Sequence, residues 1–478
     1  METECTQRTF AFHGLSSRDV VARFDGGHVT SDAGGLLLRE VEAKFRFLER
    51  FARCFVDHRD PDLVEHSVLD LVKQRVFGLC LGYEDLNDHD RLRLDPLLAV
   101  LVGKADPTGR DRSRKRDKGK PLAGKSTLNR LELTPPGADE DSRYKKIVAR
   151  VAKMQEFFVD AFLLQHDTPP ERIVLDIDAT DDPIHGHQPG KFFHGYYDNY
   201  CYLPLYIFCG EHPLCALLRP SDIDEAAGAL AQVRRIVEHI RRAWPRVTIV
   251  LRGDSGFCRD AILAWCEANG VHYVFGLPKN KRLKRILGGE LQQAKEAFEA
   301  TGRASRVFKD FTYRTRKSWS RERRVVGKAE HLAKGANPRF VVTSLSADEF
   351  DAKTLYEVEY CGRGNMENRI KEQQLMLFAD RTSCETMRAN QIRLCLSTAA
   401  SIVMQALRNF GLKHTEMAPA QCDTIRTRLL KIGAVVKVSV RRVCVSLSES
   451  FPLADVFARA VEALKALPPR PIAPAATG

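Results

Sequence analysis

The sequence predicts a mixed α/β fold in which helices pack on a sheet that includes one hairpin. Short β-branched, apolar runs predict buried strands at 172–178, 246–254 and 272–278. Two further strands, 201–209 and 212–219, are joined by Gly210 and Glu211 and are expected to pair as the hairpin. Helical patterns at about 222–242 and 258–269 lie between these strands, and this alternation is typical of layered α/β structures.

The length of 478 residues indicates more than one domain. We expect a mainly helical region at 1–165, because apolar residues recur at helical spacing over much of 18–104. The α/β core is expected at 170–412, interrupted by a basic, strand-rich insertion at about 285–346. A helix and strand segment follows at 413–478, and its proline-rich end has a composition that predicts disorder.

Positive charge is concentrated in two stretches of the chain. The net charge is +12, yet residues 103–130 carry ten Lys and Arg against three Asp, and residues 303–334 carry eleven against three acids. The rest of the chain is therefore slightly acidic. A single such run is usually a solvated loop, but two on a near-neutral body favour contacts with a polyanion, and nucleic acid is the expected partner.

Cysteine spacing and hydropathy argue against a zinc-binding, a secreted or a membrane-spanning protein. The thirteen cysteines have no zinc-binding spacing and suit a reducing cytoplasm, where each serves as a small apolar residue. We find neither a signal peptide nor an apolar run long enough to span a membrane. A cytoplasmic protein without a membrane partner is expected.

Three carboxylates stand where they could form one metal site. Asp178 ends the first predicted strand and Asp254 ends the fourth, so they meet at one edge if these two strands are neighbours. Glu367 begins a later helix, on which Tyr360, Arg363 and Glu367 share a face. Carboxylates without His or Cys suit Mg²⁺ or Mn²⁺. The alternatives are that an Asp after a strand only caps a turn, and that Asp176, on the same strand face as Asp178, is the ligand.

The motifs LDIDATDDPIHGHQ, LRGDSGF, NPRFVVTSL and YCGRGNMENRIKEQ, with FDGGHVTSDAGG near the start, resemble the DDE transposases of bacterial insertion sequences. The resemblance covers about residues 10–465 and is strongest to the branch typified by insertion sequence 1380. It implies an RNase H-like core and assigns catalysis and metal binding to Asp178, Asp254 and Glu367. A signature Tyr-x2-Arg-x3-Glu-x6-Lys matches at Tyr360, Arg363 and Glu367 but has Gln374 at its last position. Lys371, one turn from Glu367, is the candidate replacement.

The resemblance implies a transposase that cleaves DNA at the terminal inverted repeats of its element and joins the 3′ ends to target DNA with two Mg²⁺ or Mn²⁺ ions. Its partners would be double-stranded repeat and target DNA and a second copy of the chain in a synaptic homodimer, on the bacterial nucleoid. The N-terminal region and a basic arm at 109–121, with Arg110, Arg112, Arg114, Lys115 and Arg116, are expected to bind DNA. The alternatives are a metal-dependent nuclease that does not join strands and a non-catalytic DNA-binding relative.

Three weaker signals remain. Residues 119–126, GKPLAGKS, match the P-loop pattern, but the charged residues before them cannot form a buried strand, so no nucleotide cofactor is expected. Trp319 is the only tryptophan in the second basic stretch. It is predicted either to stack on a DNA base near the cleaved end or to anchor the insertion. His185, His187 and His194 lack a fourth ligand at suitable spacing and are expected to be structural or to face DNA.

Overall fold

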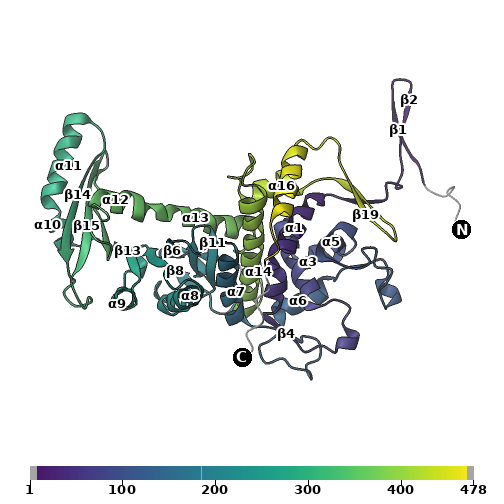
Figure 1. Ribbon diagram of the computed structural model, residues 1–478, viewed down its shortest axis with the longest axis horizontal. Coiled ribbons are helices and arrows are strands. Elements are labelled where there is room, and N and C mark those ends of the chain that lie inside the picture. Colours follow the sequence, from purple (N-terminus) through teal and green to yellow (C-terminus); the bar gives the residue numbers. More distant parts are fainter. Residues whose placement is uncertain (1–7, 185, 471–478) are drawn as a thin grey trace. The chain divides into compact units, whose positions relative to one another are not determined.

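A computed structural model (Figure 1) describes residues 8–184 and 186–470. His185 and the last eight residues of the tail expected to be disordered lie outside these ranges. The chain forms two compact units, one of Met1–Arg150 with Ala399–Gly478 and the other of Val151–Thr398. No helix among the described residues is long and apolar enough to cross a membrane.

The division differs from the expected three parts, because the C-terminal segment belongs to the first unit. Strand β18 (Ala434–Val438) forms antiparallel hydrogen bonds with β3 (His28–Thr30), a strand about 400 residues earlier in the chain. Helix α7 (Val151–Leu164), which was expected in the N-terminal region, is part of the second unit. Pairing between such distant segments leaves no local pattern in the sequence.

The first unit is largely helical, as expected. Its helices are α1 (Leu36–Phe45), α2 (Phe47–Ala52), α3 (Val68–Cys80), α4 (His89–Leu92), α5 (Pro96–Val102), α6 (Lys125–Leu133), α15 (Cys422–Ile425) and α16 (Ala454–Ala466). Its remaining strands are β1 (Phe10–Leu15), β2 (Arg18–Ala22), β4 (Phe55–Asp57), β5 (Ile147–Ala149) and β19 (Val443–Leu447). Strands β1 and β2 form an exposed hairpin, so the stretch that was expected to be mostly helical from residue 18 begins with a strand. The arm at 109–121 contains only a short 3-10 turn, Lys115–Asp117, as expected of a loop.

The second unit is built on one mixed sheet. The strand order is β11-β10-β6-β12-β13-β17-β15-β14, with β16 beside β15. The strands are β6 (Arg172–Ala179), β10 (Leu205–Cys209), β11 (His212–Leu217), β12 (Thr248–Gly253), β13 (His272–Leu277), β14 (Ser305–Tyr313), β15 (Arg323–Leu332), β16 (Gly335–Ala336) and β17 (Arg339–Thr343). Strands β6, β12 and β13 are parallel, and β10–β11 is the predicted hairpin. A small separate sheet holds β7 (Asp182–Pro183), β8 (Phe192–His194) and β9 (Asn199–Tyr202).

Helices cover both faces of this sheet. The larger core lies on one face, where Ile173, Leu175 and Ile177 of β6 pack with apolar residues of α7, α8 (Ala229–Ala243) and α9 (Asp260–Ala268). A smaller cluster on the other face joins Val250 and Val274 to Leu355 in a helical segment. The alternation of side chains along β6 directs Asp176 and Asp178 to this second face. The other helices of the unit are α10 (Lys281–Ile286), α11 (Gly288–Thr301), α12 (Ala352–Thr354), α13 (Gly364–Lys371) and α14 (Met387–Ala406), which runs on into the first unit.

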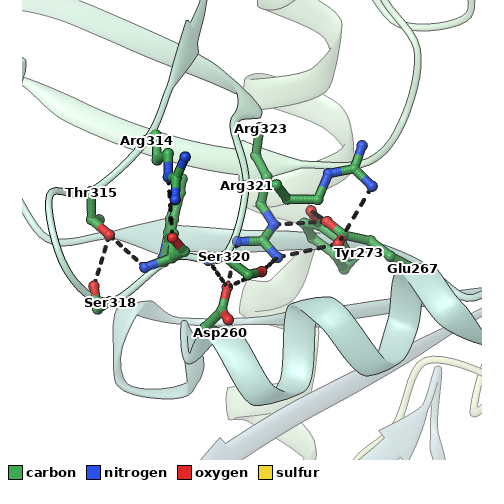
Figure 2. Close-up of polar contacts among 10 residues, drawn as sticks. Asp260, Glu267, Tyr273, Arg314, Thr315, Ser318, Ser320, Arg321 and Arg323 are labelled. Carbon is green, nitrogen blue, oxygen red and sulfur yellow. Dashed lines mark hydrogen bonds and ion pairs between the residues drawn. The ribbon is translucent and has the colours of Figure 1, made fainter.

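The insertion extends the central sheet instead of forming a sheet of its own. Strand β17 pairs antiparallel with β13, and β15 and β14 follow it outward. Figure 2 shows how the loop between β14 and β15 is attached to α9: Arg323 pairs with Asp260 and Glu267, each at 2.7 Å. The backbone N–H of Ser320 also donates to Asp260. These charged contacts hold the insertion against the helix layer of the core.

The hypothesis that Trp319 stacks on DNA is not consistent with its position. Its side chain is 5% exposed and belongs to the larger core. The ring of Tyr313 packs against it edge-on at 5.9 Å, and the Arg323 guanidinium lies 5.3 Å from the ring centroid. An indole enclosed in this way has no free face for a base, so Trp319 anchors the insertion.

Replacing Trp319 with Ala is therefore expected to destabilise the protein by about 3–5 kcal/mol, the usual cost of deleting a large buried aromatic side chain. Urea unfolding followed by circular dichroism measures this change. Arg316→Ala, in the same loop, is the control and is expected to leave the midpoint unchanged. An unaltered midpoint in Trp319→Ala would contradict the anchoring role.

Candidate active site

The parallel pairing of β6 with β12 brings two of the predicted carboxylates to one edge of the sheet. Arg252 lies opposite Asp176 and Gly253 lies opposite Ile177, so Asp178 and Asp254 follow on adjacent strands. The two aspartates were expected to meet only if the first and fourth predicted strands are neighbours, and the pairing of β6 with β12 confirms this. Asp254 also begins a 3-10 turn, Ser255–Phe257, in which its carboxylate accepts a 2.8 Å hydrogen bond from the Gly256 N–H.

Glu367 reaches this edge from a long helical segment on the second face of the sheet. The segment runs through a π-helix (Leu355–Tyr360), a 3-10 turn (Cys361–Arg363) and α13. Arg363 lies between the carboxylates: one guanidinium nitrogen is 3.3 Å from an oxygen of Asp178, and the other is 3.0 Å from an oxygen of Glu367. The guanidinium thus ties the helix to the strand end.

These residues line one cavity of about 1080 Å³. Its wall includes all three predicted acids, together with Arg363, Lys371 and Gln374. His194 also lines it, whereas Tyr360 lies in an adjoining cavity of about 500 Å³ that shares Ser255, Pro278 and Arg363 with the first. The Tyr360 hydroxyl packs so closely on Gly276 that a Cβ there would lie 2.7 Å from it.

Burial and like charge make the cavity costly for anionic groups. Burial raises the pKa of Asp178 to about 7; the Arg363 guanidinium opposes this shift, and the nearby Asp254 and Glu367 add to it. The neighbouring carboxylates thus repel one another when all are ionised. A site of this kind favours a bound cation, and Arg363 supplies a positive charge in the present conformation.

Glu225 is a fourth acid at this site that the sequence analysis missed. It lines the cavity, and a methyl group at Gly256 would overlap its carboxylate. Burial, followed by the charge of Asp254, raises the pKa of Glu225. The sequence predicts a helix over about 222–242, but α8 begins only at Ala229. The stretch before it is a loop that Arg219 holds by donating to the carbonyl oxygens of Glu225 and Ala227.

Asp176, the alternative to Asp178 as the metal ligand, is paired with Arg252. Its two oxygens accept hydrogen bonds from Arg252 at 2.5 and 2.8 Å, and its side chain is almost completely buried. It lines a different cavity from Asp178. The geometry therefore favours Asp178 over Asp176 as the strand-end carboxylate that a ligand can reach.

The donor chemistry of the cavity fits a hard divalent cation, although the side chains are not yet gathered around one. Asp178, Asp254, Glu367 and Glu225 offer only oxygen, the donor that Mg²⁺ and Mn²⁺ prefer. Within residues 8–184 and 186–470, no three His, Cys, Asp or Glu side chains are close enough together to hold a metal ion as placed. Glu367 is 47% exposed and paired with Arg363 rather than directed at the two aspartates.

The last position of the signature has a structural role here. The Gln374 side-chain amide donates to the carbonyl oxygen of Asp181 and, at 2.9 Å, to the buried carboxyl of Asp182. Lys371 is exposed and lines the cavity three residues earlier. The positive charge available at this end of the helix is thus that of Lys371.

The basic arm belongs to the first unit and is only partly free. Arg112 pairs with Glu65 at 2.7 Å and contacts His66, whereas Arg110, Arg114, Lys115 and Arg116 are exposed. The P-loop-like stretch does not have the architecture of a P-loop. No strand occurs between Asp57 and Ile147, a stretch described throughout, and Lys125 binds Asn87 and Asp90.

The comparison with known families covers almost the whole chain. Residues 12–469 match the family described as transposase DDE domain group 1. No curated protein sequence matches the chain. The matched range covers the second unit and most of the first, and thus the cavity as well as the basic arm.

The carboxyl of Asp182 provides a pH test of this wall of the site. One oxygen accepts the Gln374 bond, and the other has no hydrogen-bond partner among the described residues. Burial raises its pKa to about 8, and the charges of Asp380 and Asp181 add to the shift. A raised carboxyl pKa favours the folded state at low pH, and that contribution is lost as pH rises from about 4 toward 8. Asp182→Asn should therefore gain stability relative to wild type over this range.

The measurement is the free energy of unfolding of both proteins at pH 5, 7 and 9 in EDTA, compared as a difference so that other titrating groups cancel. Asp348→Asn, at an exposed position of the same unit, is the control and should follow wild type throughout. A constant difference between Asp182→Asn and wild type across this pH range would contradict a neutral buried carboxyl.

Proposed function

Since the chain belongs to the family of transposase DDE domains, we propose that it is a transposase that cleaves DNA at the ends of its own insertion sequence and joins the 3′ ends to target DNA. The observation that carries the proposal is the convergence of Asp178, Asp254 and Glu367 on one cavity from two parallel strand ends and a helix. The placement of the first and fourth strands side by side also supports an RNase H-like core, and the motifs support the branch typified by insertion sequence 1380.

Asp178, Asp254 and Glu367 would hold two Mg²⁺ or Mn²⁺ ions, with Glu225 adding negative charge beside Asp254. Such ions polarise the attacking and leaving oxygens of a phosphodiester. The chain itself contributes a rigid strand edge that fixes the two aspartates and a helix that presents the glutamate. Arg363 is placed to donate to a phosphate oxygen beside these acids, since a planar guanidinium binds phosphate and carboxylate in the same geometry. Lys371 lines the same cavity and Tyr360 lines the adjoining one, and both are proposed to contact DNA.

The remaining parts of the proposal concern partners. The N-terminal region and its basic arm, 109–121, bind the inverted repeats, and a homodimer holds two transposon ends together. This assembly is proposed from the family resemblance, in which the two ends of an element are held together for cutting and joining. No nucleotide takes part, since phosphodiester exchange needs no external energy source.

Asp178→Asn, Asp254→Asn and Glu367→Gln are each expected to reduce cleavage at least a hundredfold while DNA binding persists. Each change keeps the side chain's shape but removes one charged oxygen ligand. The measurement is nicking of a supercoiled plasmid carrying the element's ends in Mg²⁺, alongside a gel shift in EDTA. Asp348→Asn makes the same chemical change outside the cavity and should cleave normally.

The products distinguish the proposed activity from its alternatives. Joined donor and target DNA are expected for the wild type, whereas a nuclease would give only nicked or linear plasmid. Cleavage that persists in any one of the three variants would remove that residue from the site. Binding without cleavage in the wild type would favour a non-catalytic relative.

A further inference from the structure

A second cavity, in the first unit, has the composition of an anion site. Its volume is about 400 Å³, and it is lined by side chains from 59–66, Arg93 and 112–130. Seven of the lining residues are basic, namely Arg59, Arg93, Arg112, Arg114, Arg116, Lys120 and Arg130, against two acids, Glu65 and Asp117. Such an excess of positive charge in a confined space is unfavourable unless a negative partner enters.

The protein neutralises only part of this charge. Arg59 forms a two-bond pair with Asp57, and Arg112 pairs with Glu65. Within the described ranges, Arg93, Arg114 and Arg130 have no carboxylate partner within ion-pair distance. Burial, and then the charge of Arg59, lowers the pKa of Arg130. Three guanidinium groups therefore remain available to an anion.

The wall of the cavity is also short of hydrogen-bond acceptors. His66 is 95% buried, and burial together with Arg112 and other cations lowers its pKa to about 3, so its ring is neutral. Arg112, which can only donate, contacts its Nε2 atom, so the hydrogen is on Nδ1. Within residues 8–184 and 186–470, neither His66 Nδ1 nor Arg112 Nε has an acceptor. A ligand rich in acceptor oxygens matches this surplus of donors.

The N-terminus of α6 lies at the same cavity. Gly124, before the helix, provides no side-chain cap, and the Lys125 N–H donates to the Asp90 carboxylate. Ser126 and Thr127 of the first turn line the cavity. The Lys125 and Thr127 N–H groups are already bonded, so the turn offers an anion the Ser126 and Thr127 hydroxyls and the positive end of the helix dipole. Most of the P-loop-like stretch thus lies at a site suited to phosphate, although it lacks the strand of a nucleotide-binding loop.

The surroundings favour a phosphate within a DNA backbone over that of a nucleotide. None of the lining residues is Phe, Tyr or Trp, and only Leu63, Leu122 and Ala123 are apolar, so a base would have no surface on which to stack. The exposed Arg110, Lys115 and Lys118 continue the positive charge along the arm outside the cavity. A polymer with regularly spaced phosphates can use both the cavity and the arm.

We propose that this cavity holds one phosphate of a DNA backbone, bound by Arg93, Arg114 and Arg130 and by the first turn of α6. The inference rests on DNA binding as proposed above but not on DNA cleavage. It fixes the register of the first unit on the duplex, because a phosphate seated in a cavity positions the protein more strictly than contacts with exposed side chains outside it.

The test uses the full-length protein and a short fluorescein-labelled duplex of mixed sequence in EDTA. Binding is measured by anisotropy at several salt concentrations. Arg130→Gln and Arg114→Gln are each expected to weaken binding and to lower the slope of log K against log salt by about 0.9, the value for one lost phosphate contact. Arg39→Gln removes the same charge from an exposed site of this unit, where the nearest carboxylate is 4.0 Å away, and should keep the slope. Because Arg114 is exposed, its variant tests the proposal even if Arg130→Gln fails to fold.

Unchanged slopes and affinities in both cavity variants would overturn the proposal. Inorganic phosphate and ATP, tested by thermal shift, distinguish the source of the phosphate. A stabilisation of the wild type that is lost in Arg130→Gln, while the DNA slope stays the same, would assign the cavity to a free phosphate or nucleotide and overturn the proposal. The outcome is independent of catalysis. If the wild type does not cleave DNA in Mg²⁺ but the cavity variants lower the salt slope as expected, the result contradicts the proposed active site and not the phosphate-binding cavity.

Discussion

The arrangement of the candidate active site depends on the register of one parallel strand pair, β6 with β12. This register sets Asp178 and Asp254 side by side at the edge where both strands end. It is fixed by burial: Ile173, Leu175 and Ile177 face the larger core, so a slip by one residue would remove them from that core and turn Asp176 and Asp178 into it. The hydrophobic alternation of β6 therefore positions its own carboxylates.

Two aspartates on the same face of β6 show how differently a buried carboxylate can be accommodated. Asp176 is almost enclosed and has a two-bond pair with Arg252. Asp178 has one 3.3 Å contact with Arg363, which is shared with Glu367. Removing one partner of such a buried pair leaves the other charge uncompensated and destabilises the fold, so the pair of Asp176 with Arg252 serves stability. The loosely paired Asp178 opens onto the cavity, where a divalent cation could take over the charge that Arg363 now supplies.

Patterns within single segments predicted the fold of the second unit well. The strands containing Asp178 and Asp254 and the helix containing Glu367 each carry their signal locally. What could not be predicted depends on distant partners: the pairing of β18 with β3, the extension of the central sheet by β17, and the enclosure of Trp319 by Tyr313 and Arg323. Glu225 was missed because the residues preceding α8 were interpreted as helix, and only the folded loop places it near Asp254.

The two basic stretches show why the charge of a segment differs from the charge of a surface. By sequence, 303–334 is the more positive, yet much of its charge is neutralised: Arg306 pairs with Glu330 and Glu357, Arg324 with Asp310, and Lys309 with Glu290. Arg323 pairs with two acids of α9. Strands place such partners opposite one another, so the positive charge there stabilises a sheet. The 103–130 stretch is mostly loop and offers fewer cross-strand partners. The positive charges of Arg114 and Arg130 are therefore not neutralised within the part of the protein that the structure describes. Although residues 103–130 are the less positive stretch by sequence, they are the stronger candidate for binding DNA.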